Sequence, residues 1–244
     1  TRSTTPGAPV TWCREILARG SGRGLVVNAG NANVFTGAIG DASVRETASA
    51  AAGVLGCAPD EVFIASTGVI GEILPHDKII AKLPDAKAKL TENGWDAAAG
   101  AIRTTDTFAK GASATAQIGG KTVTIAGIAK GSGMVQPNMA TMLSFVFTDA
   151  AIPAAILQEV LSPAIDRTFN SITVDSDTST SDTLLLFATG AAGNAAPASV
   201  SDPALDGFKQ ALETVLRELA LLVVRDGEGA QKLIEVRVTG AVSD

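Results

Sequence analysis

Residues 117–122, with the sequence Gln-Ile-Gly-Gly-Lys-Thr, decide which α/β fold the chain can adopt. Two consecutive glycines supply the positive φ angles of a two-residue turn, so this stretch predicts a β-hairpin. The outgoing strand is expected over 122–125. A hairpin joins antiparallel strands, whereas a strict doubly wound fold is built from parallel strands and crossover helices. The hairpin therefore favours a layered α/β fold with a mixed sheet.

Apolar runs on both sides of the hairpin predict further strands. They lie at 25–27, 62–64, 142–147 and 184–188. The first is expected to run into a Gly/Asn loop at 28–33, and the second to stop at 66–68. Strict alternation of apolar and charged residues predicts one more, half-buried strand at 234–238.

Helix signals alternate with these strands, as a layered α/β fold requires. Ser43 and Glu46 have the spacing of a capping box and predict a helix that ends near Gly56. A Lys-rich helical stretch is expected over 77–100, interrupted by Pro84. Pro153 is expected to begin a helix that ends near residue 168. Asp202 and the proline after it are expected to cap a long helix with one apolar face, made of Leu205, Phe208, Leu212, Val215, Leu216 and Leu219.

The composition excludes several classes of protein. Of the 244 residues, 46% are hydrophobic and 18% are charged, which is typical of a chain with a packed core rather than a disordered one. The net charge of −6 argues against a nucleic-acid partner and against a polybasic membrane surface. No signal sequence is recognised at the start, and no apolar run approaches the roughly 18 residues of a membrane span. A cytoplasmic protein is expected.

The chain contains a single histidine, His76, and two cysteines. Any Ser-His or Cys-His pair would need His76, which lies beside a proline and is expected in a loop or at a helix N-cap. Two cysteines are too few for a disulfide framework or a Cys-rich zinc site. The stretch at 119–122 lacks the earlier glycine of a P-loop, and 175–179 lacks the glycine and glutamate of a calcium loop. No metal site is expected.

One segment is hard to explain by folding alone. Residues 130–143 have the sequence Lys-Gly-Ser-Gly-Met-Val-Gln-Pro-Asn-Met-Ala-Thr-Met-Leu. One interpretation is a plain connection between strands. The other is self-cleavage before Thr141, which would free the α-amino group of that threonine. An α-amine with an ordinary pKa of roughly 7.7–8.0 suits a general base near neutrality, and it can activate its own hydroxyl.

The same segment resembles the cleavage motif of the ornithine acetyltransferases (glutamate N-acetyltransferases) of arginine biosynthesis. Further matching motifs occur in the family's order over nearly the whole chain, at 27–37, 66–71, 104–106, 169–175 and 225–229. The resemblance implies a self-processing fold of the N-terminal-nucleophile type. It also implies cleavage between Ala140 and Thr141, which would divide the chain into an α portion, 1–140, and a β portion, 141–244, in one catalytic fold and an α2β2 assembly.

The resemblance also implies roles for particular residues. Thr141 would take the acetyl group of N2-acetyl-L-ornithine as an ester and pass it to L-glutamate. Thr67 and Gly68 match the pair that stabilises the oxyanion. Thr104, Lys130, Thr141 and Glu228 match the substrate contacts, with Lys130 a candidate for the α-carboxylate and Glu228 for an ammonium group. Without the resemblance, Thr67 and Gly68 also fit a turn after a strand, Lys130 a solvated loop charge, and Glu228 a residue at the end of a helix.

No cofactor or metal follows from the resemblance. Acetyl-CoA is a co-substrate of bifunctional members, and the residues do not separate the two kinds of enzyme. The family's chains extend beyond both ends of this one, so we expect a central portion of a longer protein. Two alternatives remain open: an inactive truncated fragment, and a related self-processing aminopeptidase, although those enzymes typically have serine at the cleavage point.

Overall fold

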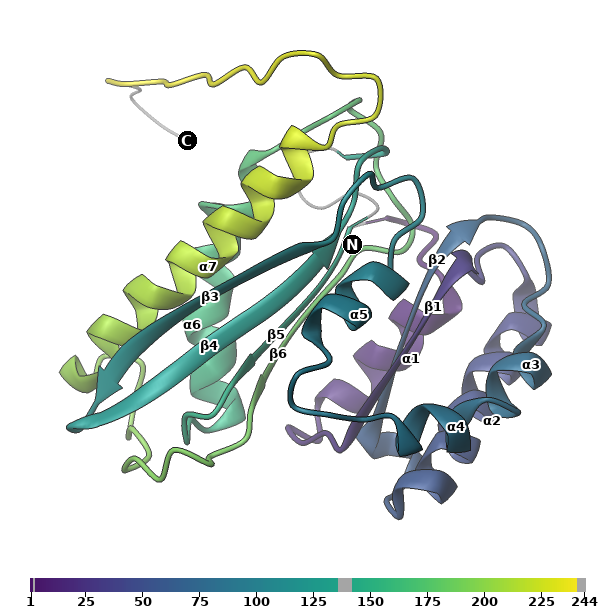
Figure 1. Ribbon diagram of the computed structural model, residues 1–244, viewed down its shortest axis with the longest axis horizontal. Helices are drawn as coiled ribbons and strands as arrows, with labels where there is room; N and C mark the ends of the chain where they lie inside the picture. Colours follow the sequence, from purple (N-terminus) through teal and green to yellow (C-terminus); the bar gives the residue numbers. More distant parts are fainter. Residues whose placement is uncertain (2, 136–141, 241–244) are drawn as a thin grey trace.

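The computed structural model describes residues 1, 3–135 and 142–240 (Figure 1). Its α-helices are α1 (Ala8–Leu17), α2 (Gly37–Leu55), α3 (His76–Ile80), α4 (Leu83–Ala88), α5 (Trp95–Ala101), α6 (Ala154–Asp166) and α7 (Asp206–Arg225). Short 3-10 turns lie at Pro59–Glu61, Phe169–Ser171 and Pro203–Leu205.

The larger sheet contains β3 (Lys110–Ile118), β4 (Lys121–Lys130), β5 (Leu143–Thr148) and β6 (Thr183–Ala188), in that spatial order. The pairs β3–β4 and β4–β5 are antiparallel, and β5–β6 is parallel. The two-residue turn between β3 and β4 is formed by Gly119 and Gly120, with φ angles of 57° and 78°. The expected hairpin and the expected mixed sheet are therefore both confirmed.

A second, two-stranded sheet pairs β1 (Gly24–Asn31) with β2 (Val62–Val69) in parallel. Both strands are longer than their apolar runs predict. Asn28 lies opposite Ser66, and Ala29 opposite Thr67, so polar residues expected in loops continue the ladder. Backbone pairing between the strands does not depend on side-chain polarity, which is why the hydrophobic pattern ended the strands too early.

Figure 1 shows how the helices and the two sheets are layered. Three apolar clusters hold these layers together. The first lies between one face of the larger sheet and helices α6 and α7, and it includes the predicted apolar face of α7. The second joins α1 and α2 to β1 and β2. The third joins β2 and α5 to the other face of the larger sheet, through Ala65, Ile128 and Phe145 among others. The two sheets therefore face each other across a shared core.

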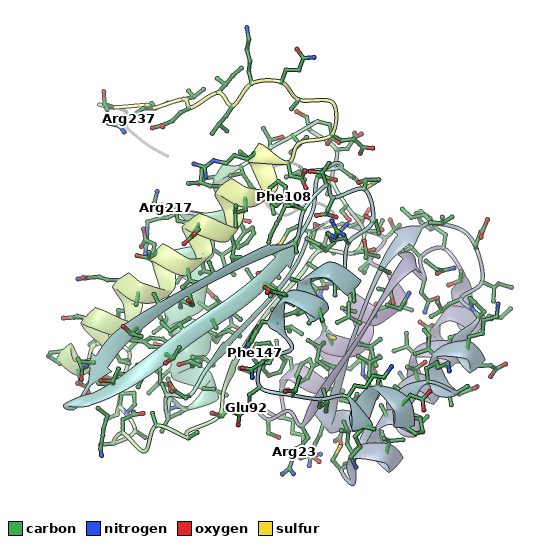
Figure 2. All side chains as sticks on the ribbon, viewed as in Figure 1. Arg23, Glu92, Phe108, Phe147, Arg217 and Arg237 are labelled. Atoms are coloured by element: carbon green, nitrogen blue, oxygen red, sulfur yellow. The ribbon has the colours of Figure 1, made fainter. Side chains whose placement is uncertain are left out.

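Aromatic rings connect the two sheets directly. Phe147 of β5 stacks on Phe187 of β6, with 5.1 Å between ring centroids. Phe63 of β2 meets Phe187 edge to face at 5.3 Å. Phe147, labelled in Figure 2, is partly buried and also meets Trp95 of α5 edge to face at 5.7 Å. Phe147 and Phe187 lie opposite each other in the larger sheet, so the Phe63–Phe187 pair is the contact that joins the two sheets, in an edge-to-face geometry that aromatic pairs favour.

Two helix starts differ from the sequence expectations. Helix α2 begins at Gly37, and Ser43 lies in its interior, where its hydroxyl donates to the carbonyl of Ile39 at 2.8 Å instead of capping. The helix ends at Gly56 as expected, with φ 75°. Pro84 is the second residue of α4 and does not break a helix, because the first turn needs no N–H from it. The stretch 77–100 is therefore divided among α3, α4 and α5.

The expected strand at 234–238 is wrong. Ile234, Val236 and Val238 are 80%, 81% and 76% exposed, and none of the described residues forms a strand beside them. Arg237 marks this extended segment, which runs outside the body of the molecule (Figure 2). An alternating pattern predicts a strand only where a partner strand supplies the ladder, and the described part of the chain supplies none here.

The predicted α and β portions contribute to the same sheet, since β3 and β4 precede residue 140 and β5 and β6 follow it. The boundary itself stays a prediction, because Ala140 and Thr141 lie outside the described residues. Among the residues described, none of the helices combines the length and hydrophobicity that crossing a bilayer requires.

Candidate active site

Lys130 is the last residue of β4 and is 2% exposed. Its Nζ donates to Oγ1 of Thr104 at 2.8 Å and to Oγ1 of Thr67 at 3.3 Å. Asp106 Oδ2 lies 3.7 Å from the same nitrogen. Lys130 is therefore not a solvated loop charge. The structure brings three sequence-predicted site residues, Thr67, Thr104 and Lys130, into direct contact.

Thr67 and Gly68 lie within β2 rather than in a turn after it. Thr67 is fully buried and opposite Ala29 of β1. Gly68 has φ +130°, and a Cβ atom there would lie 2.3 Å from the carbonyl carbon of Gly30. Only glycine fits this conformation and this close approach. Gly68 therefore lets β2 run against β1 while Thr67 is held beside Lys130.

A buried network of charges surrounds Lys130. Lys110, at the start of β3, is fully buried, and its Nζ contacts Asp106 Oδ1 at 2.6 Å and Asp226 Oδ2 at 2.5 Å. Asp106 Oδ1 also accepts the backbone N–H of Gly131 at 2.7 Å. Asp226 accepts hydrogen bonds from the backbone N–H and the hydroxyl of Thr107. Two lysines and two aspartates thus neutralise one another out of contact with water.

The network changes the acidity of its members. Burial opposes ionisation of Asp106, but hydrogen bonds from Lys110 and Gly131 outweigh it, and the pKa of this carboxyl is lowered. The pKa of Asp226 is lowered in the same way: burial opposes ionisation, and Lys110 and Thr107 outweigh it. Burial lowers the pKa of the Lys130 ammonium, although the charge of Asp106 partly offsets this. Both carboxyls are therefore ionised, and Lys130 gives up a proton more readily than a solvated lysine.

Glu228 lies beside the segment that follows Lys130. Its backbone N–H donates to the carbonyl of Ser132 at 2.6 Å, and a Cβ atom on Gly133 would lie 2.5 Å from its Oε2. The side chain is exposed. Gly133 therefore leaves the space that the Glu228 carboxylate occupies, and this carboxylate remains accessible to a cation from solution.

Thr141 and Ala140 lie outside the described residues, but both flanks of this stretch are anchored. The N–H of Val135 donates to Asp175 Oδ1 at 2.9 Å, and its carbonyl accepts the N–H of Val174 at 2.7 Å. The N–H of Met142 donates to Asp182 Oδ1 at 3.0 Å. Leu143, two residues beyond the predicted nucleophile, lies opposite Lys130 in the sheet.

Asp182 is a further buried acid that the sequence analysis missed. It is 2% exposed, and burial raises its pKa to about 7, against the opposing effect of the Met142 N–H. Lys110 and Asp226 were also missed as parts of the site, although Asp226 falls within one of the matching motifs. A lysine at the head of a strand of small residues gives no signal in a hydrophobicity pattern. Only its complete burial marks it, since lysines are almost never buried without partners.

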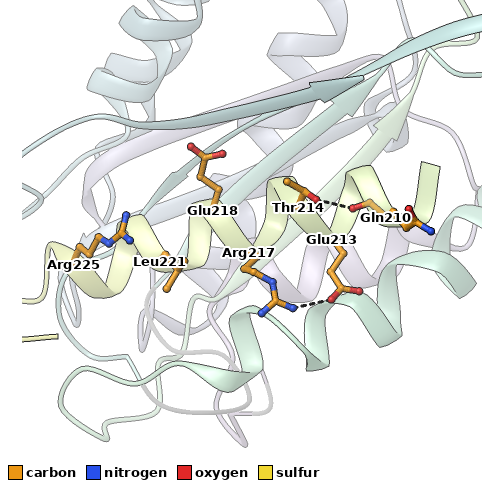
Figure 3. Close-up of a pocket in the computed structure, with 7 residues that line it drawn as sticks. All are labelled: Gln210, Glu213, Thr214, Arg217, Glu218, Leu221 and Arg225. Carbon is orange, nitrogen blue, oxygen red and sulfur yellow. Dashed lines mark hydrogen bonds and ion pairs between the residues drawn. The ribbon is translucent and has the colours of Figure 1, made fainter. Parts of the chain in front are cut away.

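A shallow hollow of about 560 Å³ lies elsewhere, on the outer face of α7 (Figure 3). Seven residues line it: Gln210, Glu213, Thr214, Arg217, Glu218, Leu221 and Arg225. Arg217 pairs with Glu213 at 2.8 Å along the helix, with more than half of the arginine side chain exposed. The hollow contains none of the predicted site residues, and we regard it as solvated helix surface.

The cluster around Lys130 combines a buried ammonium, two hydroxyls and a glycine-containing strand end. Such a group can hold a carboxylate or stabilise a developing oxyanion in a site of low dielectric. Within residues 1, 3–135 and 142–240, no set of three or more His, Cys, Asp or Glu side chains lies close enough together to hold a metal ion.

Comparison with known proteins places the chain in a family. The ArgJ family model matches residues 1–244. The arginine biosynthesis bifunctional protein ArgJ of Gluconobacter oxydans is 59% identical over the full chain and that of Rhizobium meliloti 57%. The chain spans 58% and 60% of the length of these two curated relatives.

A crystal structure of the arginine biosynthesis bifunctional protein argJ from Bacillus halodurans is similar with a TM-score of 0.51 and 33% sequence identity, over 58% of this chain and 73% of that one. The expectation of a mixed α/β fold like that of this family is therefore confirmed. With a family match through all 244 residues and relatives identical at more than half of the aligned positions, the chain belongs to the ArgJ family, as its sequence motifs indicated.

Proposed function

We propose that this chain is the central part of an acetyltransferase in arginine biosynthesis. The complete enzyme would move the acetyl group of N2-acetyl-L-ornithine to L-glutamate through an acetyl ester on Thr141. The observation that carries the proposal is the convergence of Thr67 and Thr104 on the buried ammonium of Lys130. Membership of the ArgJ family and the relatives' names, which refer to arginine biosynthesis, support it.

The first step is self-cleavage. Water cleaves the peptide bond between Ala140 and Thr141: its hydroxyl joins the carbonyl carbon of Ala140, which becomes a carboxylate, and its proton joins the nitrogen of Thr141. The free α-amine of Thr141 can then act as the general base for its own hydroxyl. The sheet register supports this location, since Leu143 lies opposite Lys130. The cleaved parts would stay together, because β3 and β4 share a sheet with β5 and β6. An α2β2 assembly is the arrangement that we propose for them.

Acetyl transfer then follows in two half-reactions. The Thr141 hydroxyl oxygen attacks the acetyl carbonyl carbon, and its proton passes to the α-amine of Thr141. The tetrahedral oxyanion accepts hydrogen bonds from the Thr67 hydroxyl and the Gly68 N–H. The bond from carbon to the ornithine nitrogen breaks, and the leaving amine takes the proton. The neutral amine of glutamate next attacks the ester carbon, and its proton returns through the α-amine to the Thr141 oxygen.

The charged residues are assigned to substrate binding. Lys130, buried and with a hydroxyl on either side, receives the α-carboxylate of the substrate. Glu228, exposed beside Gly133, receives the side-chain ammonium of ornithine. Thr104, at the mouth of the site, holds Lys130 in place and contacts the substrate. No resident metal or cofactor takes part in this scheme. Acetyl-CoA is proposed as a second acetyl donor, since the relatives are named bifunctional.

Cleavage is tested in the full-length protein by denaturing electrophoresis, intact mass and N-terminal sequencing. The wild type should give two fragments, the second beginning with Thr141, and T141A should give one uncut chain. A wild-type chain that stays whole after long incubation would remove Thr141 as the nucleophile.

Transfer is tested with acetyl-labelled N2-acetylornithine. The label should appear on Thr141 when glutamate is absent and on N-acetylglutamate when it is present. Release of free acetate alone would indicate hydrolysis, as in a self-processing aminopeptidase. The same assay on residues 1–244 alone separates an active core from an inactive fragment.

A further inference from the structure

Lys110 is buried more completely than any other lysine named above, yet it contacts no predicted substrate residue. Its Nζ lies 2.6 Å from Asp106 Oδ1 and 2.5 Å from Asp226 Oδ2, and 4.7 Å from the centroid of the Phe108 ring. It therefore links the turn before β3 to the segment after α7. A fully buried lysine is costly to maintain in a fold, which suggests that its position serves the site.

The two carboxylate oxygens of Asp106 accept hydrogen bonds from different partners. Oδ1 accepts from Lys110 and from the N–H of Gly131, and Oδ2 accepts from the N–H of Thr104 at 3.2 Å. The distance from Oδ2 to Lys130 Nζ is 3.7 Å, which is an ion-pair distance but too long for a hydrogen bond. Asp106 is therefore committed to Lys110 and to the backbone, and only its charge reaches Lys130.

The Lys130 ammonium can therefore donate a further hydrogen bond. An ammonium has three N–H groups, and the described residues accept two of them, at Thr104 and Thr67. The charges balance without a direct hydrogen bond between Lys130 and a carboxylate, since Lys110 lies between Asp106 and Asp226.

We propose that Lys110 is a positioning residue that holds the Asp106 carboxylate away from Lys130 and so keeps the Lys130 ammonium available to a substrate carboxylate. This inference rests on the proposed function in one respect, the assignment of Lys130 to carboxylate binding. Without Lys110, only the backbone N–H groups of Gly131 and Thr104 hold the Asp106 carboxylate. A small movement would then close the 3.7 Å gap to Lys130 and fill the site with the protein's own carboxylate.

The test uses the double variant K110M/D226N in the full-length protein. Methionine is similar in length and apolar, and asparagine removes the carboxylate that would otherwise be left unpaired, so Asp106 and Lys130 balance each other. Competitive labelling with acetic anhydride over a pH series, read by mass spectrometry, gives the pKa of Lys130 without any requirement for activity. We expect that pKa to rise by about one pH unit or more, as for a direct ion pair.

The groups that face Lys130 define the controls. They are the hydroxyls of Thr67 and Thr104, the ammonium of Lys110, and the carboxylates of Asp106 and Asp182. Adding D106N to the double variant removes the carboxylate that is expected to move, so the pKa of Lys130 should fall back to the wild-type value or below. A fold that had merely loosened would raise it in both variants. K121M, at an exposed lysine of the same hairpin, should change nothing.

The single variant D226N tests the proposal independently if the double variant does not fold. Freed from Asp226, Lys110 should hold Asp106 more tightly, and the pKa of Lys130 should fall. The proposal is overturned by an unchanged or raised Lys130 pKa in D226N, by an unchanged value in a folded double variant, or by a rise that D106N does not reverse.

Kinetics separate the positioning role from the proposed function. Where the wild type transfers acetyl groups, K110M/D226N should raise KM for N2-acetylornithine about tenfold or more, the cost of losing a charged hydrogen bond, with a smaller change in kcat. A wild type without transfer activity would count against the proposed function and leave the labelling result to decide on Lys110.

Discussion

At the scale of single residues, the site is built around Lys130, the last residue of β4. Lys130 is predicted by the sequence as a substrate ligand, but its neighbours explain how it can act. Thr67 accepts its hydrogen bond at 3.3 Å, which leaves the threonine's own proton free to be donated. Thr67 therefore can connect the ammonium to an oxyanion, and this makes its hydroxyl testable separately from its shape.

Replacing Thr67 with valine should reduce catalysis without unfolding the protein. T67V keeps the β-branched shape within β2 and replaces the hydroxyl with a methyl group. The rate of acetyl-Thr141 formation should fall about 100-fold, with a smaller loss of substrate affinity because the oxyanion exists only in the tetrahedral species. The free energy of unfolding should change by about 1 kcal/mol. Single-turnover acetylation and a thermal melt of the full-length enzyme measure both.

The neighbouring variant G68A is the control, because we expect it to reduce stability, whereas T67V should mainly reduce the rate. Its new Cβ would lie 2.3 Å from the carbonyl carbon of Gly30 at a φ of +130°, so it should lower the melting temperature. A T67V enzyme that loses stability and keeps its rate would assign Thr67 to folding instead of catalysis.

At the scale of elements, the β3–β4 hairpin determines the direction of the strand that carries Lys130. Its register runs without a break from Ile118 opposite Lys121 to Lys110 opposite Ala129. A two-residue turn with two positive φ angles matches the twist of the strands that it joins. The turn therefore sets which residues of β3 face which residues of β4, up to the end where Lys110 and Lys130 lie.

Replacing both turn glycines with alanine should destabilise this hairpin. Gly119 and Gly120 have φ angles of 57° and 78° and open space around them, so the penalty is one of backbone conformation. We expect a loss of about 1–2 kcal/mol per residue in the free energy of unfolding, measured by urea denaturation.

Gly111 in β3 is the matched control. Its added Cβ would make an ordinary contact of 3.7 Å with the carbonyl oxygen of Gly127, and no positive φ is required there. G111A should therefore be neutral or slightly stabilising. Equal effects of the turn and strand substitutions would contradict a specific role for the turn.

At the scale of the whole molecule, buried carboxyl groups make stability depend on pH. Their pKa values are shifted in opposite directions. Lys110 holds Asp106 and Asp226 ionised, whereas burial raises the pKa of Asp182 to about 7. A carboxyl with a raised pKa in the folded state binds its proton more tightly there than in the unfolded chain. Its contribution to stability is therefore greatest below the unfolded value of about 4 and declines as the pH rises to about 7.

Asp182 should accordingly make the protein less stable at pH 8 than at pH 5. D182N can still accept the N–H of Met142 and carries no charge, so its melting temperature relative to wild type should increase across that range. The difference at pH 8 is expected on the order of 2–4 kcal/mol. D177N, at an exposed aspartate nearby in the chain, should show no such trend. A constant difference between pH 5 and pH 8 would contradict the raised pKa.

The sequence by itself determined the parts of this protein that depend on local chemistry. Two glycines specified the hairpin, an apolar stripe specified α7, and the motifs around 130–143 identified the family. The Asp-Pro pair, expected to cap the long helix, caps instead the 3-10 turn Pro203–Leu205 that precedes α7. Local signals failed where pairing decided the outcome. Residues 28–31 continue a strand because β2 lies beside them, and 234–238 do not form one because no described strand does.

The site was only partly accessible to sequence for the same reason. Thr67, Thr104 and Lys130 could be named from motifs, but their meeting at one ammonium is a product of the packing of two sheets. Lys110 and Asp182 could not be found, because what distinguishes them is burial and not residue type. Burial depends on contacts between segments far apart in the chain, and Lys110 meets Asp226 across 116 positions, so only the tertiary structure decides it.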